Sequence, residues 1–166
     1  MTLKKSALVA LALMLPLATA SAQQAAAPAP APGYGAPISL DAAKKVIAAG
    51  QAEAKKNGWT MVISVIDTGG NLVALERMDG TQLGSIQVAQ DKAHTALFFK
   101  RPSKSFQDGL AQGGENNRYL AMAGVLPVDG GDLIISGGAI IGAIGVSGAA
   151  SAQDGQVAKA GAAASK

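Results

Sequence analysis

The chain of 166 residues contains no cysteine and few aromatic side chains, which make up 4% of the sequence. Without cysteine no disulfide can form, so the fold must be held together by its hydrophobic core alone. The apolar residues are mainly alanine, valine, isoleucine and leucine, a composition that favours alanine-faced helices lying close to a sheet. Because 14 basic residues stand against 11 acidic ones, the charge is too balanced to indicate a basic face for nucleic acid.

The first 22 residues have the three parts of a secretory signal peptide. Lys4 and Lys5 form a basic start, an apolar run covers residues 7–18, and residues 20–22 are a small-residue cleavage site. The alternative is a retained membrane anchor, for which the apolar run is short. Cleavage removes two of the 14 basic residues and leaves 12 against 11 acidic ones, a net charge of +1. We therefore expect a periplasmic or secreted protein with no stable membrane span.

Residues 23–38 are rich in alanine and proline and cannot bury a core, because proline blocks helix formation. This composition is typical of an extended linker. The remainder of the chain is long enough for one domain. The sequence thus predicts a signal peptide over 1–22, a linker over 23–38 and a single domain over 39–164.

Strands are expected where short apolar runs are separated by glycine turns. Two such pairs are apparent, one turning at residues 67–71 and the other at Gly137 and Gly138. A further short apolar run precedes the second pair. The predicted strands are residues 59–66, 72–77, 125–128, 133–136 and 140–147.

Helices are expected where apolar residues recur at helical spacing between capping residues. Ser39 caps the first helix, Ser85 opens the second, and Pro102 ends it. Ser151 and Asp154 form a capping box in its Asp form before the last helix. The predicted helices are about 40–56, 85–100, 106–111 and 151–164.

The hairpins imply an antiparallel sheet with helices packed against it, which defines a single α+β domain. The segment 133–150 carries no charge over eighteen residues. That length is compatible with a transmembrane helix. Its five glycines and the break at Gly137 favour a buried hairpin instead.

His94 is the only histidine of the chain and lies on the second predicted helix. Gln87, Gln90 and Asp91 precede it at helical spacing and share its face. Asp91 could orient one ring nitrogen while the other binds a metal. One imidazole suffices as an axial ligand of haem iron, whereas a zinc site made of protein groups needs three or four ligands. The alternative is a histidine at the surface or at a subunit interface with no ligand.

Several other side chains could contact an iron-porphyrin or another anion. Met78 is a candidate soft axial ligand, although methionine in such a position commonly packs in a core or loop. Arg77, Lys92 and Lys100 could pair with carboxylates. Arg101 could do the same, but at a helix C-terminus it serves equally well to compensate the helix dipole.

Motifs for nucleotide binding and hydrolysis are missing from the sequence. The glycines at 138, 142 and 145 form neither a P-loop nor a dinucleotide fingerprint. No Gly-x-Ser-x-Gly elbow is present to accompany His94. The residues alone therefore indicate an exported α+β domain and leave its ligand open.

Three blocks of the sequence resemble the GlcG/HbpS-like family, also called the haem-degrading domain family. They are residues 65–80 (VIDTGGNLVALERMDG), residues 92–96 (KAHTA) followed by Pro102 and Ser103, and residues 138–148 (GAIIGAIGVSG) followed by Asp154. The resemblance extends from about Ser39 to Ala164. It implies an antiparallel five-stranded sheet flanked by helices, and homo-oligomers that are often octamers. It also implies a haem-related role, since some exported members bind haem and some are linked to haem breakdown.

We therefore predict an exported haem-binding protein. His94 is the candidate axial iron ligand on chemical grounds rather than by the resemblance. Arg77 and Lys92 are the candidate propionate contacts, and Met78 is a further candidate contact of the cofactor. Two alternatives stay open: a haem-degrading enzyme, for which no distinct catalytic group stands out, and an oligomeric binder of another small metabolite.

Overall fold

The computed structural model of the chain describes residues 30–165. The predicted signal peptide and residues 23–29 of the predicted linker lie outside this range. The described part contains four strands, four α-helices and one 3₁₀-helix. In chain order these are α1 Leu40–Lys56, β1 Val62–Asp67, β2 Leu72–Arg77, α2 Ser85–Phe98, α3 Lys104–Gln112, η1 Gly114–Ala121, β3 Gly131–Ser136, β4 Ala139–Ser147 and α4 Ser151–Ala163.

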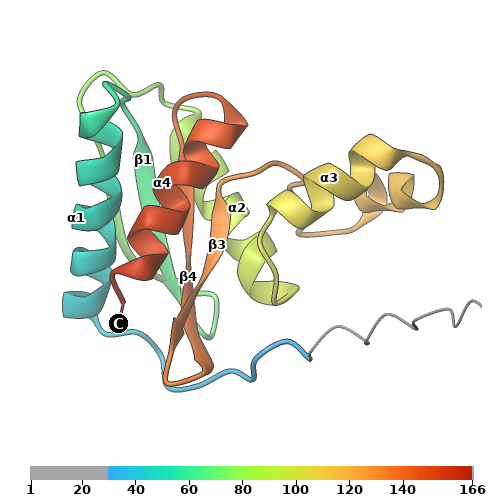
Figure 1. Ribbon diagram of the computed structural model, residues 1–166, viewed down its shortest axis with the longest axis horizontal. Helices are drawn as coiled ribbons and strands as arrows, with labels where there is room; N and C mark the ends of the chain where they lie inside the picture. The colour runs from blue at the N-terminus through green and yellow to red at the C-terminus, as the bar shows by residue number, and fades with distance from the viewer. Residues whose placement is uncertain (1–29, 166) are drawn as a thin grey trace, which may run out of the picture.

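The strands form one antiparallel sheet in the order β2-β1-β4-β3. Helices α1 and α4 cover one face of the sheet and α2 covers the other (Figure 1). Alternate residues of β1 serve the two layers, since Ile63 and Val65 pack towards α1 and α4 while Ile66 packs towards α2. The α+β prediction is confirmed, and among the described residues no helix is long and apolar enough to cross a membrane.

The expected fifth strand is absent from the described residues, where 125–128 form a loop. The Leu126 amide donates to the Thr95 hydroxyl at 2.8 Å, and the Val128 carbonyl accepts from the Ser103 hydroxyl at 2.7 Å. Side chains therefore take up backbone groups that a strand would offer to its neighbour. The prediction of five strands is wrong for this part of the chain, whose sheet has four.

Residues 33–38, at the end of the predicted linker, run beside β4 and extend its pairing (Figure 1). Strand β1 pairs with β4 only as far as Gly142. Beyond that point the Ile140 amide donates to the Gly33 carbonyl at 2.9 Å, and the Gly35 amide donates to the Ile140 carbonyl at 2.7 Å. These bonds satisfy polar groups of β4 that β1 leaves unpaired.

The two predicted helix caps have different outcomes. Ser39 caps α1 as expected, because its hydroxyl accepts a backbone amide of the first turn at 3.3 Å. The capping box proposed for Ser151 and Asp154 is wrong. Helix α4 instead starts after Ala150, whose amide donates to the Gln153 side chain at 3.0 Å. Asp154 is buried and serves another purpose, described below.

Helix α2 lies very close to β4 because the facing residues are small. Ala89, Ala93 and Ala96 are fully buried in this layer. Gly145 of β4 faces the helix, and a Cβ atom at this position would collide with the Ala89 carbonyl. The close approach agrees with the alanine-rich packing that the composition predicts.

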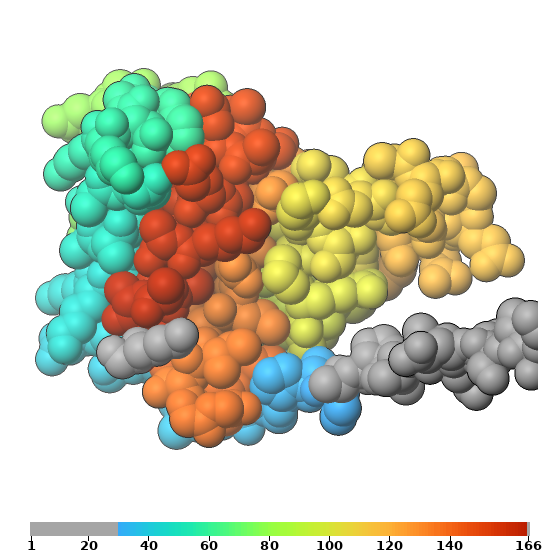
Figure 2. Space-filling view, viewed as in Figure 1, coloured from blue at the N-terminus to red at the C-terminus, as the bar shows by residue number. Residues whose placement is uncertain are grey.

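Helices α3 and η1 form an arm that stands out from the rest of the molecule (Figures 1 and 2). Its base is an aromatic cluster in which the Phe106 ring meets Phe99 and Tyr119 edge to face, with ring centroids 5.2 and 5.1 Å apart. The Arg101 guanidinium lies over Phe106 at 4.0 Å from the ring centroid. This contact is a cation–π interaction and gives Arg101 a packing role.

Candidate functional site

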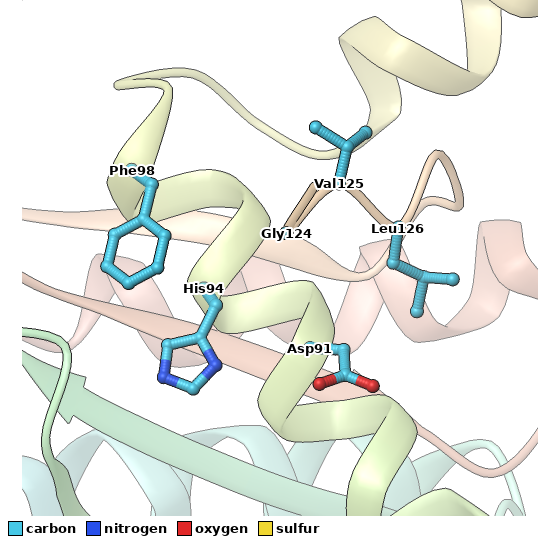
Figure 3. Close-up of a pocket in the computed structure, with 6 residues that line it drawn as sticks. All are labelled: Asp91, His94, Phe98, Gly124, Val125 and Leu126. Atoms are coloured by element: carbon cyan, nitrogen blue, oxygen red, sulfur yellow. The ribbon is translucent and has the colours of Figure 1, made fainter. Parts of the chain in front are cut away.

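A cavity of about 360 Å³ lies beside α2 (Figure 3). Three of its residues come from α2, where positions 91, 94 and 98 share a face, and three come from the loop after η1. Its volume is near the lower end of the roughly 300–1,000 Å³ found for small-molecule sites. The lining residues are Asp91, His94, Phe98, Gly124, Val125 and Leu126.

Thr95 holds the loop wall of this cavity against α2. Its hydroxyl donates to the Asp91 carbonyl at 2.8 Å and accepts the Leu126 amide, also at 2.8 Å. The buried hydroxyl thus bridges helix and loop. In Figure 3 the Leu126 side chain extends towards the end of the helix that carries Asp91, while the Val125 side chain points away from the helix.

His94 is half-buried at the side of the cavity. Its Nε2 atom lies 2.9 Å from the Gly70 carbonyl oxygen. Its ring stacks on Phe98, with centroids 5.3 Å apart and an angle of 23° between the planes. Phe98 itself is 53% exposed. The two rings therefore form a partly open aromatic surface at the end of α2.

The turn between β1 and β2 presents the Gly70 carbonyl to His94. The Asp67 carboxylate accepts the Asn71 amide at 2.9 Å and the Gly69 amide at 2.8 Å. These bonds, chiefly the one from the Asn71 backbone, hold the pKa of the Asp67 carboxyl below its ordinary value. Gly70 has a φ of 81°, which favours glycine.

Asp91 does not orient the histidine ring as the sequence suggested. Its carboxylate accepts a hydrogen bond from the Gln87 side chain at 2.9 Å. The partner of the His94 ring is instead the Gly70 carbonyl, which lies 24 residues earlier in the chain. Asp91 contributes a carboxylate to the cavity wall, so the site has an acidic side as well as an apolar one.

Lys92 lies away from the cavity and is 1% exposed. Its ammonium group forms an ion pair of 2.6 Å with the Asp154 carboxylate, and both side chains are buried. Burial raises the pKa of Asp154, and the hydrogen bond from Lys92 opposes that effect. The position predicted for a propionate contact is therefore closed, and we assign Lys92 to the structure of the core.

Arg77 and Met78 line a second cavity of about 360 Å³, together with Gln51, Lys55 and Asp79. The two cavities share no lining residue. Met78 packs against the core shared by α1, β1 and α4. The chain therefore does not bring Arg77 or Met78 into the cavity that contains His94.

Phe98 and Gly70 are site residues that the sequence analysis missed. Phe98 could have been found, because it stands one helical turn after His94 on the same face. The Gly70 carbonyl could not, since no local pattern shows which backbone oxygen a distant side chain will meet. Among residues 30–165, no group of three or more histidine, aspartate or glutamate side chains lies together as a metal site.

The family model described as "Haem degrading protein HbpS-like" matches residues 38–163. The chain is 41% identical over 110 residues to Protein GlcG of Escherichia coli strain K12, an alignment that covers 66% of this chain and 81% of the relative. The chain therefore belongs to the HbpS-like family, as the resemblance predicted.

Two solved structures share the fold and part of the sequence. HbpS superposes with a TM-score of 0.70 at 33% identity, covering 78% of this chain and 90% of the HbpS chain. The PduOC–haem complex superposes with a TM-score of 0.69 at 25% identity, covering 77% and 94%. The family description and this haem complex support a haem-related role.

Proposed function

We propose that the chain is an exported haem-binding protein that holds iron-porphyrin beside His94. The observation that carries the proposal is the stacked pair of His94 and Phe98 at the edge of a cavity with an apolar wall. A porphyrin needs a nitrogen, sulfur or oxygen donor for its iron and flat apolar contacts for its ring. The imidazole supplies the donor, while Phe98 and Leu126 supply the contacts.

The residues at the cavity fit a haem group in their exposure as well as in their chemistry. Phe98 is 53% exposed although it is a large aromatic side chain. Covering such a ring is favourable by about 25 cal/mol for each Å² of apolar surface removed from water. When bound, haem would supply the iron that accepts the imidazole electron pair; this chain supplies the ligand, the stacking surface and the apolar wall.

A homo-oligomer is part of the proposal, in the octameric form that the family resemblance implies. The cavity is small for a whole porphyrin, so part of a bound haem would extend beyond the surface of one chain. A second copy could cover that part. Large apolar side chains exposed on the single chain support such contacts; they include Leu72, Leu83, Phe98 and Leu120 at 52%, 72%, 53% and 69% exposure.

Arg77 and Met78 have a place in this proposal only if the porphyrin is shared between copies. Within one chain they line the other cavity. Arg77 is exposed and donates weakly to the Thr81 carbonyl at 3.5 Å, so its guanidinium is accessible to a carboxylate. Light scattering of the protein with and without haem would show whether assembly accompanies binding.

Haem titration of the mature protein, residues 23–166, tests the proposal. We expect a saturable shift of the Soret band at one haem per subunit or fewer. Absence of a shift, or a linear increase without saturation, would contradict haem binding and leave another small ligand as the function to pursue. The size of the free and haem-loaded protein is recorded in the same samples.

Haem degradation is the second candidate, because the matching family model is described by that activity. Ring opening requires bound haem, a reductant and oxygen. Incubation of the haem complex with ascorbate in air separates the two functions. A stable Soret band supports binding alone, whereas its loss with formation of a bilin-like product supports degradation.

Export is proposed from the sequence of residues 1–22. Intact mass and N-terminal sequencing of the protein from the periplasmic fraction or the medium test it. We expect a chain that begins at Gln23. Recovery of the full-length chain with the membrane fraction would contradict cleavage.

A further inference from the structure

We propose that the Gly70 carbonyl fixes His94 in the tautomer protonated at Nε2, so that Nδ1 is the electron-pair donor that His94 offers to the cavity. The turn from Asp67 to Asn71 thereby becomes the positioning element of the site. The inference rests on the proposed function for its biological meaning and specifies which atom of the ligand acts. The tautomer itself can be tested without haem.

The chemistry of the contact between His94 and Gly70 determines the tautomer. The two heavy atoms, His94 Nε2 and the Gly70 oxygen, are 2.9 Å apart, which is a normal hydrogen-bond distance. A carbonyl oxygen only accepts, so the proton of this bond must be on Nε2. A neutral imidazole carries one ring proton, and Nδ1 therefore holds the lone pair.

Figure 3 shows the directions in which the two ring nitrogens of His94 point. One ring nitrogen of His94 is on the side of the ring towards Asp91, and the other points away from it. The Asp91 carboxylate would favour a proton on Nδ1 if it accepted from it, but its side-chain hydrogen bond comes from Gln87, at 2.9 Å, and the hydrogen bond of the His94 ring goes to Gly70. Gly70 is thus the partner that selects the tautomer among the described contacts of His94.

The turn is built to hold the Gly70 carbonyl still. The residues on both sides of Gly70 donate their amides to one oxygen of Asp67, at 2.8 Å from Gly69 and 2.9 Å from Asn71. The Gly70 amide donates to the Asp67 backbone carbonyl at 3.1 Å. The Asp67 carboxylate bonds to Gly69 and Asn71 and not to the imidazole, so Asp67 is a positioning residue that acts through the Gly70 carbonyl.

Packing fixes the ring plane as well. A Cβ atom at Gly70 would lie 2.9 Å from Phe98 Cε1, so the bare glycine allows the turn to rest against the Phe98 ring. The same ring stacks on His94. Rotation of the imidazole by half a turn would therefore break the bond to Gly70 within a closely packed group of three residues. Since Nδ1 adjoins Cγ, a metal centre bound there would lie closer to α2 than one bound at Nε2.

The test is a long-range ¹⁵N–¹H correlation spectrum of haem-free protein with ¹⁵N-labelled histidine, recorded without an affinity tag near pH 8. The chain has a single histidine, so assignment is unambiguous. We expect Nε2 to give the protonated-nitrogen shift and Nδ1 the lone-pair shift. The opposite pattern, or the averaged shifts of a free imidazole, would overturn the proposal.

Asp67→Ala tests the positioning role, with Asp41→Ala as control for loss of an exposed carboxylate. We expect Asp67→Ala to move the two nitrogen shifts towards the averaged values and to weaken haem binding by about 10-fold, the lower range for a group that supports a metal ligand. Asp41→Ala should change neither. Unchanged nitrogen shifts in folded Asp67→Ala would overturn the role of the turn, and the wild-type spectrum decides the tautomer even if this variant does not fold.

The two proposals can fail separately. If wild-type Nδ1 holds the lone pair but haem does not bind, the tautomer assignment stands and the haem function falls. If haem binds and the haem-free protein is protonated at Nδ1, the function stands and the present inference is overturned.

Discussion

Lys92 on α2 and Asp154 on α4 form a buried ion pair of 2.6 Å that joins helices covering opposite faces of the sheet. The pair lies next to Gly130, just before β3, where a side chain would collide with both partners. Both residues belong to sequence blocks that carry the family resemblance. The pair therefore gives Lys92 and Asp154 a role in the fold rather than in a ligand site.

Replacing Lys92 with methionine should destabilise the protein strongly. It leaves a buried carboxylate without its partner, a change that typically costs about 3–5 kcal/mol. Lys104→Met is the matched control, because Lys104 forms a pair of the same length with Asp108 at the surface. Exposed pairs contribute about 0–1 kcal/mol. Urea unfolding of both variants measures the difference, and equal losses of free energy would contradict the structural role of Lys92.

Gly145→Ala tests the close packing of α2 on β4. The added Cβ collides with the Ala89 backbone, and overpacking of a core typically costs about 1–3 kcal/mol. Gly84→Ala is the control, because Gly84 has helical dihedral angles and open space around its Cα atom. We expect a lower thermal midpoint for Gly145→Ala only. An unchanged midpoint would show that the layers are farther apart than the structure has them.

Most of the fold could be predicted because its signals are local. The hairpin that turns at Gly69 and Gly70, and the Ser39 cap of α1, each depend on residues close in sequence. The elements that the sequence misassigned depend on distant partners. Residues 125–128 have strand-like composition, but Thr95 and Ser103 bind their backbone groups across 31 and 25 residues.

The candidate site shows the same division between local and distant information. The spacing of Asp91, His94 and Phe98 on one helix face follows from the period of the helix alone. Asp154 resembles a helix cap locally, yet its partner Lys92 is 62 residues away. The bond from His94 to the Gly70 carbonyl spans 24 residues. Such pairings depend on how the layers pack, and the residue types within a short stretch of sequence do not determine that packing.

The acid stability of the protein should reflect Asp67. Hydrogen bonds in the turn lower the pKa of its carboxyl from the ordinary 3.8, so the folded state binds fewer protons than the unfolded state near that pH. This contribution to stability is complete above the unfolded pKa and is lost as the pH falls through the lower folded pKa. The loss of stability caused by Asp67→Ala should therefore be larger at pH 6 than at pH 3.

Urea unfolding at the two pH values measures that difference. Thr68→Ala is the control in the same turn, because it removes no carboxylate, and its effect on stability should be the same at both pH values. A penalty for Asp67→Ala that is the same at pH 3 and pH 6 would contradict the role of the ionised carboxylate.

Phe98→Ala should weaken haem binding with little effect on folding. The side chain is 53% exposed, so its removal leaves no cavity in the core. Loss of a stacking contact of about 0.5–1.5 kcal/mol corresponds to roughly 2- to 10-fold in affinity. Leu40→Ala, at a residue 49% exposed and outside the cavity, is the control. Equal haem affinity in all three proteins would contradict the stacking role.

A haem titration of His94→Ala beside wild type tests whether His94 binds the haem iron. Gln90→Ala is the matched control, since Gln90 lies one turn earlier on α2 and does not line the cavity. We expect a saturable, shifted Soret band for wild type and Gln90→Ala, and a weakened, displaced band for His94→Ala. A Soret band that is identical in position and affinity in His94→Ala would contradict the assignment of His94 as the iron ligand.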